Sequence, residues 1–500
     1  MGTRRSIVAV AAAAAVAFLT TNAVTGPGAS ALTPPVLARS TVPVPAVEGP
    51  ITGPGSPSII GTSFDLAPVG YQEDEYFISG TATSYALVGR APADGRWKVT
   101  RRSKARYKTR LLVYRPSDPR RFNGTVVVEW LNESAGSDTA ADWIGDHTQL
   151  IRQGFAWVGV SAQALGVNGG TGVLAVGGKG LKKTNPPRYG TLHHPGDAFS
   201  YDIYSQAAQA IRHPRATSPL GRLKAKAVIA DGESQSAFFL TTYIDAVAPS
   251  AHVFNGYLVH SRFSGGTSLS GSLALAVHEP FRTDLGVPVL AFETETDLTL
   301  GDYASNRQPD NRWFRDWEVA GTAHADDYMT GVGLSDDGRS NVAGAIVTHD
   351  TPLTIVGCTS APNAGPQHWV LDAAFSALNR WIRTGEPAAH GPRIDVTPGG
   401  PHPTIVRDAM GNARGGIRTP ELDVPIVALS GTAATGQSAT CSLFGATTPF
   451  DRATLSALYP THADYVAKFD RATEGAVRAG FILPADASQI EAAAAASNVP

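Results

Sequence analysis

The sequence predicts an α/β fold in which an open, mostly parallel sheet is covered by helices on both faces. Two observations support this fold class. Short apolar, β-branched runs of strand type alternate along the chain with segments of helical periodicity, as in parallel sheets built from strand–helix units. In addition, the apolar run 228–230 is separated from a helical segment that begins at Ala237 by only a few small and polar residues. The chain must therefore turn sharply from strand to helix at this point.

Each expected element rests on a local pattern. Residues 96–113 indicate paired antiparallel strands, of which 107–114 is the better defined. Further along, apolar runs rich in β-branched residues predict buried strands, and periodic segments closed by glycines such as Gly154 and Gly385 predict helices. A long Gly-rich loop reaches about residue 196. In chain order, we expect strands at 124–131, 155–161, 225–230, 255–260, 288–292 and 314–319, and helices at 140–153, 198–211, 368–383 and 461–480.

The length and charge of the chain limit its organisation and its partners. Five hundred residues can bury a large core. We expect a Pro/Gly-rich leader at 32–60, a catalytic core at 61–385 and a C-terminal extension at 386–500 packed on that core. The formal net charge of −2 comes from interspersed charges of both signs, so neither a nucleic-acid partner nor a polybasic membrane patch is expected.

The N-terminus has the features of an export signal, expected to cover residues 1–31. Arg4 and Arg5 precede an apolar run at 7–19, and residues 29–31 (ASA) have the small-x-small form of a signal-peptidase site. The arginine pair also weakly resembles a twin-arginine signal. No later apolar stretch reaches the ~20 residues of a transmembrane helix. We therefore expect a secreted protein or one on the exterior of the cell envelope, with no membrane span.

The only two cysteines are Cys358 and Cys441. An even number of cysteines in an exported protein favours a disulfide. The alternative is two separate buried thiols. A bridge would tie the late part of the chain to the segment before the helix expected at 368–383.

Ser234 is the candidate nucleophile. It lies in Gly232-Glu-Ser-Gln-Ser236, in the sharp strand-to-helix turn, which has the form of a nucleophile elbow. Such a turn raises the serine hydroxyl above the sheet edge and needs small flanking residues; Ser236 stands where glycine is usual. A similar string around Ser268 lies in a Gly/Ser-rich stretch with no preceding strand, so we interpret it as a surface loop. A tight turn without chemistry is the alternative interpretation of the Ser234 segment.

A serine hydroxyl needs a base and an acid that orients the base. The strand at 288–292 is followed by Glu295 and Asp297, and the next strand is followed by His324. Groups beyond the carboxyl ends of parallel strands gather at one edge of the sheet. We expect His324 to be the base and Asp297 the acid, with Glu295 as the alternative acid. His368 is the rival base, but it opens a helix, where a capping or substrate-lining role is expected.

The oxyanion donors are expected to be backbone N–H groups. Gln235 follows the nucleophile directly, which is the usual position of the first donor. We expect the second donor at Leu131 or Asn132, after the strand at 124–131. This machinery requires no metal and no organic cofactor.

With these residues placed, the chain resembles an uncharacterised branch of the α/β-hydrolase superfamily, labelled alpha/beta hydrolase domain-containing protein. The resemblance covers about residues 60 to 485, so it implies that the C-terminal extension belongs to the same unit. It also implies an α/β-hydrolase fold and hydrolase chemistry at Ser234 and His324, without indicating a substrate. The motifs that carry the resemblance are 128–132 (VEWLN), 154–163 (GFAWVGVSAQ), 188–192 (RYGTL), 194–197 (HPGD), 232–237 (GESQSA), 295–297 (ETD), 317–324 (WEVAGTAH) and 411–418 (GNARGGIR).

These observations together predict an exported serine hydrolase, in the first place a carboxylic-ester hydrolase that acts on a small or polymeric ester. Acyl transfer, peptide hydrolysis and depolymerisation of a polyester would use the same residues. A binding protein that keeps the hydrolase fold without activity is the opposing hypothesis. The oligomeric state is not predicted.

Overall fold

The computed structural model describes residues 37–174, 177–272, 279–354, 357–397, 402–433, 436–438 and 440–500. The predicted export signal at 1–31 lies outside the described residues. No helix within these ranges is long and apolar enough to cross a membrane.

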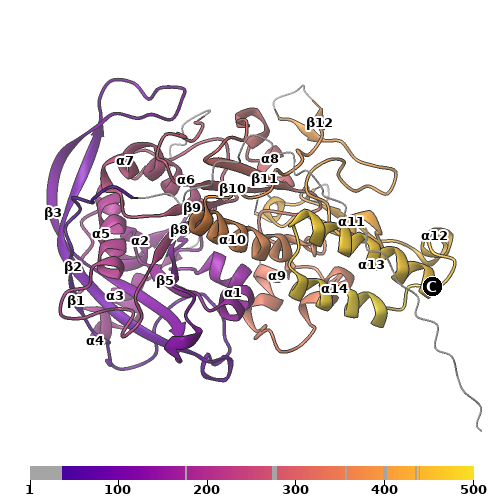
Figure 1. The fold of residues 1–500 in the computed structure, drawn as a ribbon, viewed down its shortest axis with the longest axis horizontal. Coiled ribbons are helices and arrows are strands. Elements are labelled where there is room, and N and C mark those ends of the chain that lie inside the picture. The colour runs from indigo at the N-terminus through magenta and orange to yellow at the C-terminus, as the bar shows by residue number, and fades with distance from the viewer. Residues whose placement is uncertain are drawn as a thin grey trace, which may run out of the picture.

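A nine-stranded sheet forms the centre of the molecule, and most of its strands are parallel (Figure 1). Six neighbouring strands run in the same direction, whereas the first three are joined by antiparallel pairing. The predicted sheet is thus confirmed. In spatial order the strands are β1 (Ala46–Glu48), β2 (Tyr71–Leu87), β3 (Val99–Pro116), β5 (Ala156–Val160), β4 (Thr125–Trp130), β8 (Ala227–Glu233), β9 (Gly256–His260), β10 (Val289–Thr294) and β11 (Phe314–Val319).

Helices cover both faces of this sheet because the parallel strands are apolar on both sides. In β4, Val126 and Val128 belong to the same apolar cluster as α5 (Ser200–Arg212) and α6 (Gln235–Thr242). Val127 points to the other face, where α1 (Ala141–Gln153) and α10 (Gln367–Thr384) pack. Short elements complete the loops of this core: α2 (Ala164–Asn168), β6 (Gly170–Thr171), β7 (Gly177–Gly178), α3 (Gly180–Thr184), α4 (Pro186–Tyr189), the π-helical turn Tyr243–Val247, α7 (Ala248–Ala251), α8 (Glu295–Thr299) and α9 (Asp327–Thr330).

The N-terminal strands form a long hairpin that the sequence only partly indicated. We expected two paired strands between residues 96 and 113, but β3 is one continuous strand, and its partner β2 precedes that segment. β1, from the leader segment, pairs with β2 in turn. The outer half of β3 carries charged and polar residues at nearly every position, so no apolar alternation marks it as a strand.

Residues after Gly385 pack against the β11 edge of the sheet. Ile417 continues the backbone pairing, since its N–H donates to Glu318 O and its carbonyl accepts from Ala320 N. Phe481 contacts Trp317 of β11 edge to face, with ring centroids 5.1 Å apart. The elements here are β12 (Val396–Thr397), β13 (Thr404–Ile405), α11 (Pro420–Asp423), β14 (Val427–Ser430), β15 (Ala446–Pro449), α12 (Arg452–Leu458), α13 (His462–Ala479) and α14 (Pro484–Ala496). α14 forms from the alanine-rich tail, for which the sequence predicted no element.

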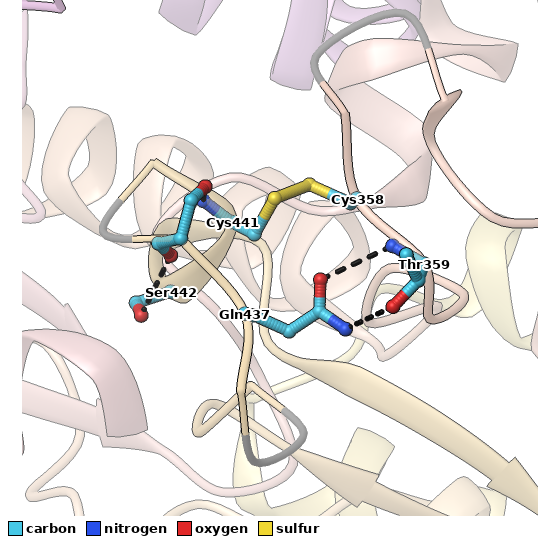
Figure 2. Close-up of a disulfide and its surroundings, with 6 residues drawn as sticks. Cys358, Thr359, Gln437, Cys441 and Ser442 are labelled. Atoms are coloured by element: carbon cyan, nitrogen blue, oxygen red, sulfur yellow. Dashed lines mark hydrogen bonds between the residues drawn. A yellow bond between two sulfur atoms is a disulfide. The ribbon is translucent and has the colours of Figure 1, made fainter.

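The two cysteines form a disulfide, as predicted. Figure 2 shows Cys358 bonded to Cys441 across 83 residues of sequence. Beside the bridge, the Gln437 amide accepts a hydrogen bond from Thr359 N (3.1 Å) and donates one to Thr359 Oγ1 (2.5 Å). The bridge therefore joins the segment before α10 to the extension.

We predict that reduction of this disulfide destabilises the protein without unfolding it. Closing a loop of 83 residues is worth roughly 4 kcal/mol in the chain-entropy model. In a protein of this size, we expect the melting temperature to fall by a few degrees. Calorimetry of the oxidised protein and of a Cys358→Ser/Cys441→Ser variant measures the shift. Two alkylated cysteines in unreduced, exported protein would contradict the bridge itself.

Candidate functional site

Ser234 lies in a strained turn between β8 and α6. Its backbone has φ 55° and ψ −118°, in the left-handed half of conformational space that non-glycine residues rarely adopt. The Ser234 N–H donates to His260 O of the neighbouring strand (3.0 Å), which ties the turn to the sheet. A Cβ on Gly232 would lie 3.1 Å from Ser236 Cβ. Glycine at 232 therefore lets strand and helix approach closely, even with serine at 236.

The structure brings His324 and Asp297 into line with Ser234. His324 follows β11, and its Nε2 lies 2.7 Å from Ser234 Oγ. Its Nδ1 lies 2.7 Å from Asp297 Oδ1, at the start of α8 after β10. His324 and Asp297 are both buried. The three side chains can pass a proton from the serine to the imidazole while the carboxylate holds the ring.

Asp297 rather than Glu295 contacts His324. Asp297 Oδ2 accepts hydrogen bonds from the N–H and the hydroxyl of Thr294, both at 2.7 Å, in a capping box at the start of α8. These bonds leave Oδ1 for the imidazole. Glu295 points to the other side of α8, where it accepts bonds from Gly321 N (2.6 Å) and Arg407 Nη2 (2.9 Å). Glu295 therefore fastens the loop before His324 and the C-terminal extension.

Two carboxylates act on the pKa of His324. Burial alone would lower the pKa of this imidazole, but the charge and hydrogen bond of Asp297 and the charge of Glu233 raise it above the ordinary value. Glu233 Oε1 lies 3.6 Å from His324 Nε2. The site therefore favours the imidazolium, the form that His324 takes when it accepts a proton.

Glu233 is a component of the site that the sequence analysis missed, although it directly precedes Ser234. It is buried, and Asn132 Nδ2 donates to its Oε2 (2.9 Å) and to its backbone O (3.1 Å). Burial raises the pKa of Glu233 to about 7, although the charges of His324 and His260 act in the opposite direction. The residue between Gly and Ser in a G-x-S string has no generally expected role. Only the position of Glu233 beside His324 in the structure shows that it belongs to the site.

The two backbone N–H groups predicted as second oxyanion donor both have hydrogen-bond partners in the structure. The N–H of Leu131 donates to Val160 O (3.3 Å), and that of Asn132 donates to Thr139 O (2.9 Å). Asn132 and Thr139 pair to close the loop after β4, so neither predicted N–H is free. The next N–H, of Glu133, points at the elbow and donates to Gln235 Oε1 (3.2 Å). The N–H of Gln235 opens α6, where no preceding helical carbonyl is available.

The rival residues lie away from this arrangement. Ser268 is in an exposed turn, where its hydroxyl contacts Ser270 Oγ at 2.8 Å and Ser272 O at 3.1 Å. His368 is buried at the start of α10 and stacks on Tyr328, with ring centroids 4.0 Å apart. Burial lowers the pKa of His368 to about 3. It is therefore a packed, neutral core residue in this structure.

Within the described ranges, no group of three or more His, Cys, Asp or Glu side chains is arranged to hold a metal ion.

Residues 42–492 match the family model described as the alpha/beta hydrolase domain. Among solved structures, the chain is similar to an esterase from Rhizomucor miehei (10% identity, 52% of this chain and 78% of that chain covered, TM-score 0.27). It is also similar to a glucuronoyl esterase from Solibacter usitatus (11%, 58% and 85%, TM-score 0.28) and to a dienelactone hydrolase from Anabaena variabilis (11%, 45% and 88%, TM-score 0.27). No match was found among curated protein sequences.

We predict that Glu233 makes stability depend on pH. An unfolded glutamate has a pKa near 4.3, so with a folded pKa of about 7 the native state keeps a proton that the unfolded state loses. This contribution to stability is full below the unfolded pKa and is lost as pH rises through 7. In Glu233→Gln, the loss of unfolding free energy between pH 5 and pH 8 should shrink by roughly 2 kcal/mol.

Urea denaturation at pH 5, 6, 7 and 8 measures this change. Glu386→Gln, which alters an exposed acid, is the matched control and should keep the pH dependence of the unmodified protein. An unchanged slope in Glu233→Gln would mean that Glu233 is ionised in the native state at pH 5.

Proposed function

Because the chain belongs to the alpha/beta hydrolase domain family, we propose that it is a serine hydrolase that cleaves carboxylic esters through an acyl-enzyme intermediate. The observation that carries this proposal is the line of short contacts from Ser234 Oγ to His324 Nε2 and from His324 Nδ1 to Asp297, at 2.7 Å each. Such a line activates a hydroxyl that is otherwise a weak nucleophile.

In the proposed reaction, Ser234 Oγ attacks the acyl carbonyl carbon while its proton passes to His324 Nε2. Asp297 keeps the Nδ1 proton of the ring in place and stabilises the imidazolium. His324 then returns the proton to the leaving alcohol, and the acyl group stays on Ser234. Water repeats the sequence, so that the acid is released and the serine is restored.

The proposed oxyanion hole consists of the N–H groups of Gln235 and Glu133. The Glu133 N–H already donates to an amide carbonyl oxygen, the side-chain Oε1 of Gln235. A substrate carbonyl oxygen would replace this acceptor when the Gln235 side chain turns aside. Two backbone donors fixed beside the nucleophile would stabilise the tetrahedral intermediate without reorganisation.

Export belongs to the proposal as well. The N-terminal residues have the pattern of a secretory signal, and the Cys358–Cys441 disulfide is compatible with an oxidising compartment outside the cytosol. Acyl transfer to an alcohol, peptide hydrolysis and polyester cleavage remain alternatives on the same residues. Nitrophenyl esters of increasing acyl length, tested beside peptide amides and polyester films, rank these substrates.

We predict that Ser234→Ala loses at least about a thousandfold in kcat on such esters and no longer reacts with a fluorophosphonate probe. His324→Ala should lose a similar factor because the two residues act as one unit. Ser268→Ala, in the exposed turn, is the control and should keep full activity and labelling. A Ser234→Ala protein that still hydrolyses esters at the original rate would refute the proposed nucleophile.

The two neighbouring acids should give opposite phenotypes. Asp297→Asn should lose at least about a hundredfold in kcat, because an amide stabilises the wrong imidazole tautomer and cannot stabilise the imidazolium. Glu295→Gln should keep most of the activity but lower the unfolding free energy by about 1–3 kcal/mol, because it weakens a charged hydrogen-bonded contact to Arg407. Activity assays and denaturation of both variants decide the assignment, and the reverse pattern would transfer the orienting role to Glu295.

A further inference from the structure

A second imidazole–carboxylate pair lies beside the candidate site. His260 is the last residue of β9, and its ring is fully buried. Its Nδ1 lies 2.6 Å from Asp142 Oδ1 on α1, and Phe292 of β10 packs against the ring edge to face, with centroids 4.9 Å apart. The backbone carbonyl of His260 accepts the N–H of Ser234 (3.0 Å). The pair is thus attached to the turn that holds Ser234, yet the reaction proposed above does not use it.

The sheet places His260 beside Glu233. These two residues are register partners in the parallel pair β8–β9, and neighbouring strands lie about 4.8 Å apart. Both side chains leave the face of the sheet on which α1 and α10 pack, because Ile229 and Leu258, at even spacing along the same strands, belong to the apolar cluster of that face. Glu233 Oε1 also lies 3.6 Å from His324 Nε2. Glu233 is therefore close to two imidazoles.

The partners of His260 favour its charged form. Asp142 is buried, and within the described ranges its only ion pair is with His260. A buried carboxylate without a cation is costly, so Asp142 stabilises the imidazolium. Burial raises the pKa of Glu129 and Asp231 well above the ordinary value, so the negative charge next to His260 stays on Asp142.

The second ring nitrogen of His260 faces an amide that suits either charge state. Gln367 Nε2 lies 3.0 Å from His260 Nε2, and the Oε1 of the same amide has no hydrogen-bond partner in the part of the chain that the structure describes. The amide can donate to a neutral ring. Turned by half a rotation, it accepts from the Nε2–H of an imidazolium. The site therefore accommodates a charged His260 without leaving a ring N–H unpaired.

Acids face His260 from several elements. Burial alone would lower the pKa of His260, but Asp142, Glu233 and Asp297 raise it above the ordinary value. Within the described ranges, no lysine or arginine forms an ion pair with these three acids. His260 is therefore the cation available to Glu233 while His324 is neutral. The ionisable groups of this region are Asp142 of α1, Glu129 of β4, Asp231 and Glu233 of β8, Asp297 of α8, and His324 and Asp326 of the segment after β11, and α10 contributes the neutral amide of Gln367.

We propose that the His260–Asp142 pair positions charge for the proposed reaction by acting through Glu233. The imidazolium of His260 holds Glu233 in its ionised form. The Glu233 carboxylate in turn stabilises the imidazolium that His324 becomes when it takes the Ser234 proton. His260 and Asp142 are thus positioning residues that do not touch the substrate. The inference rests on the proposed function, because that reaction supplies the proton.

Anchoring of α1 to β9 is the simpler role of this pair, and a buried contact would anchor the helix whatever charge the imidazole carries. The two roles differ in their effect on His324. Without the charge of His260, Glu233 stays protonated over a wider pH range, and a neutral Glu233 no longer raises the pKa of His324. The acid limb of the pH–rate profile then moves to lower pH. Anchoring alone would change the rate without moving this limb.

The first test compares pH profiles of kcat/KM for a nitrophenyl ester between the full-length protein and its His260→Gln variant. The acid limb reports the ionisation of His324 in the free enzyme, and we expect it to move to lower pH by at least about 0.5. His368→Gln is the matched control, since it replaces a buried histidine whose pKa of about 3 leaves it uncharged, and its limb should not move. An unmoved limb in His260→Gln overturns the proposal. An equal shift when His260→Gln is added to Glu233→Gln also overturns it, because the effect would then bypass Glu233.

A second measurement needs neither ester hydrolysis nor a variant of His260. Coupling between two ionisable groups is reciprocal, so Glu233→Gln should lower the pKa of His260 by at least about 0.5. NMR of protein labelled with ¹⁵N-histidine, titrated from pH 5 to pH 10, measures this pKa, and contacts with the Phe292 ring identify the His260 signals. Glu386→Gln, at an exposed acid, should leave it unchanged. An unchanged pKa in Glu233→Gln refutes the inference, whereas intact coupling in a protein that hydrolyses no ester refutes the proposed function alone.

Discussion

The contacts of His324 with Ser234 and Asp297 depend on the strands β8, β10 and β11, whose carboxyl ends lie along one edge of the sheet. His260 of β9 pairs with Glu233 of β8 on one side and with Phe292 of β10 on the other, and Phe292 pairs with Trp317 of β11. Because these strands are parallel and in register, the segments that follow them emerge at one edge. Ser234, Asp297 and His324 therefore meet although 90 residues separate Ser234 from His324.

Burial changes the pKa values of the ionisable groups at this edge of the sheet. His324 lies between Asp297, which contacts Nδ1, and Glu233, which approaches Nε2 on the side of the serine. The first carboxylate receives two hydrogen bonds from Thr294 and stays well placed, whereas burial raises the pKa of the second to about 7. One imidazole thus contacts two carboxyl groups, and the charge of one of them, Glu233, changes near neutral pH.

The C-terminal extension supports the site from outside the core. Thr296 lies between the two acids and links both units, since its hydroxyl donates to Gly431 O (2.6 Å) and accepts from His324 N (3.1 Å). Glu295 accepts from Arg407 and from Gly431 N of the extension and from Gly321 N of the loop before the histidine. The position of His324 therefore depends on contacts with residues far along the chain.

Local patterns in the sequence were sufficient for the parallel core, the elbow around Ser234, the order of acid and histidine, and the cysteine pairing. Strand periodicity and turn chemistry are properties of neighbouring residues, so they can be read without the fold. The sequence favoured Asp297 but kept Glu295 as an alternative, and only the capping geometry of α8 in the tertiary structure decides which of the two acids faces the histidine. The position of the Glu133 N–H beside the elbow also needed the tertiary structure, because the N–H groups of Leu131 and Asn132 are hydrogen-bonded elsewhere. These features arise from contacts between segments distant in sequence, and no local pattern records them.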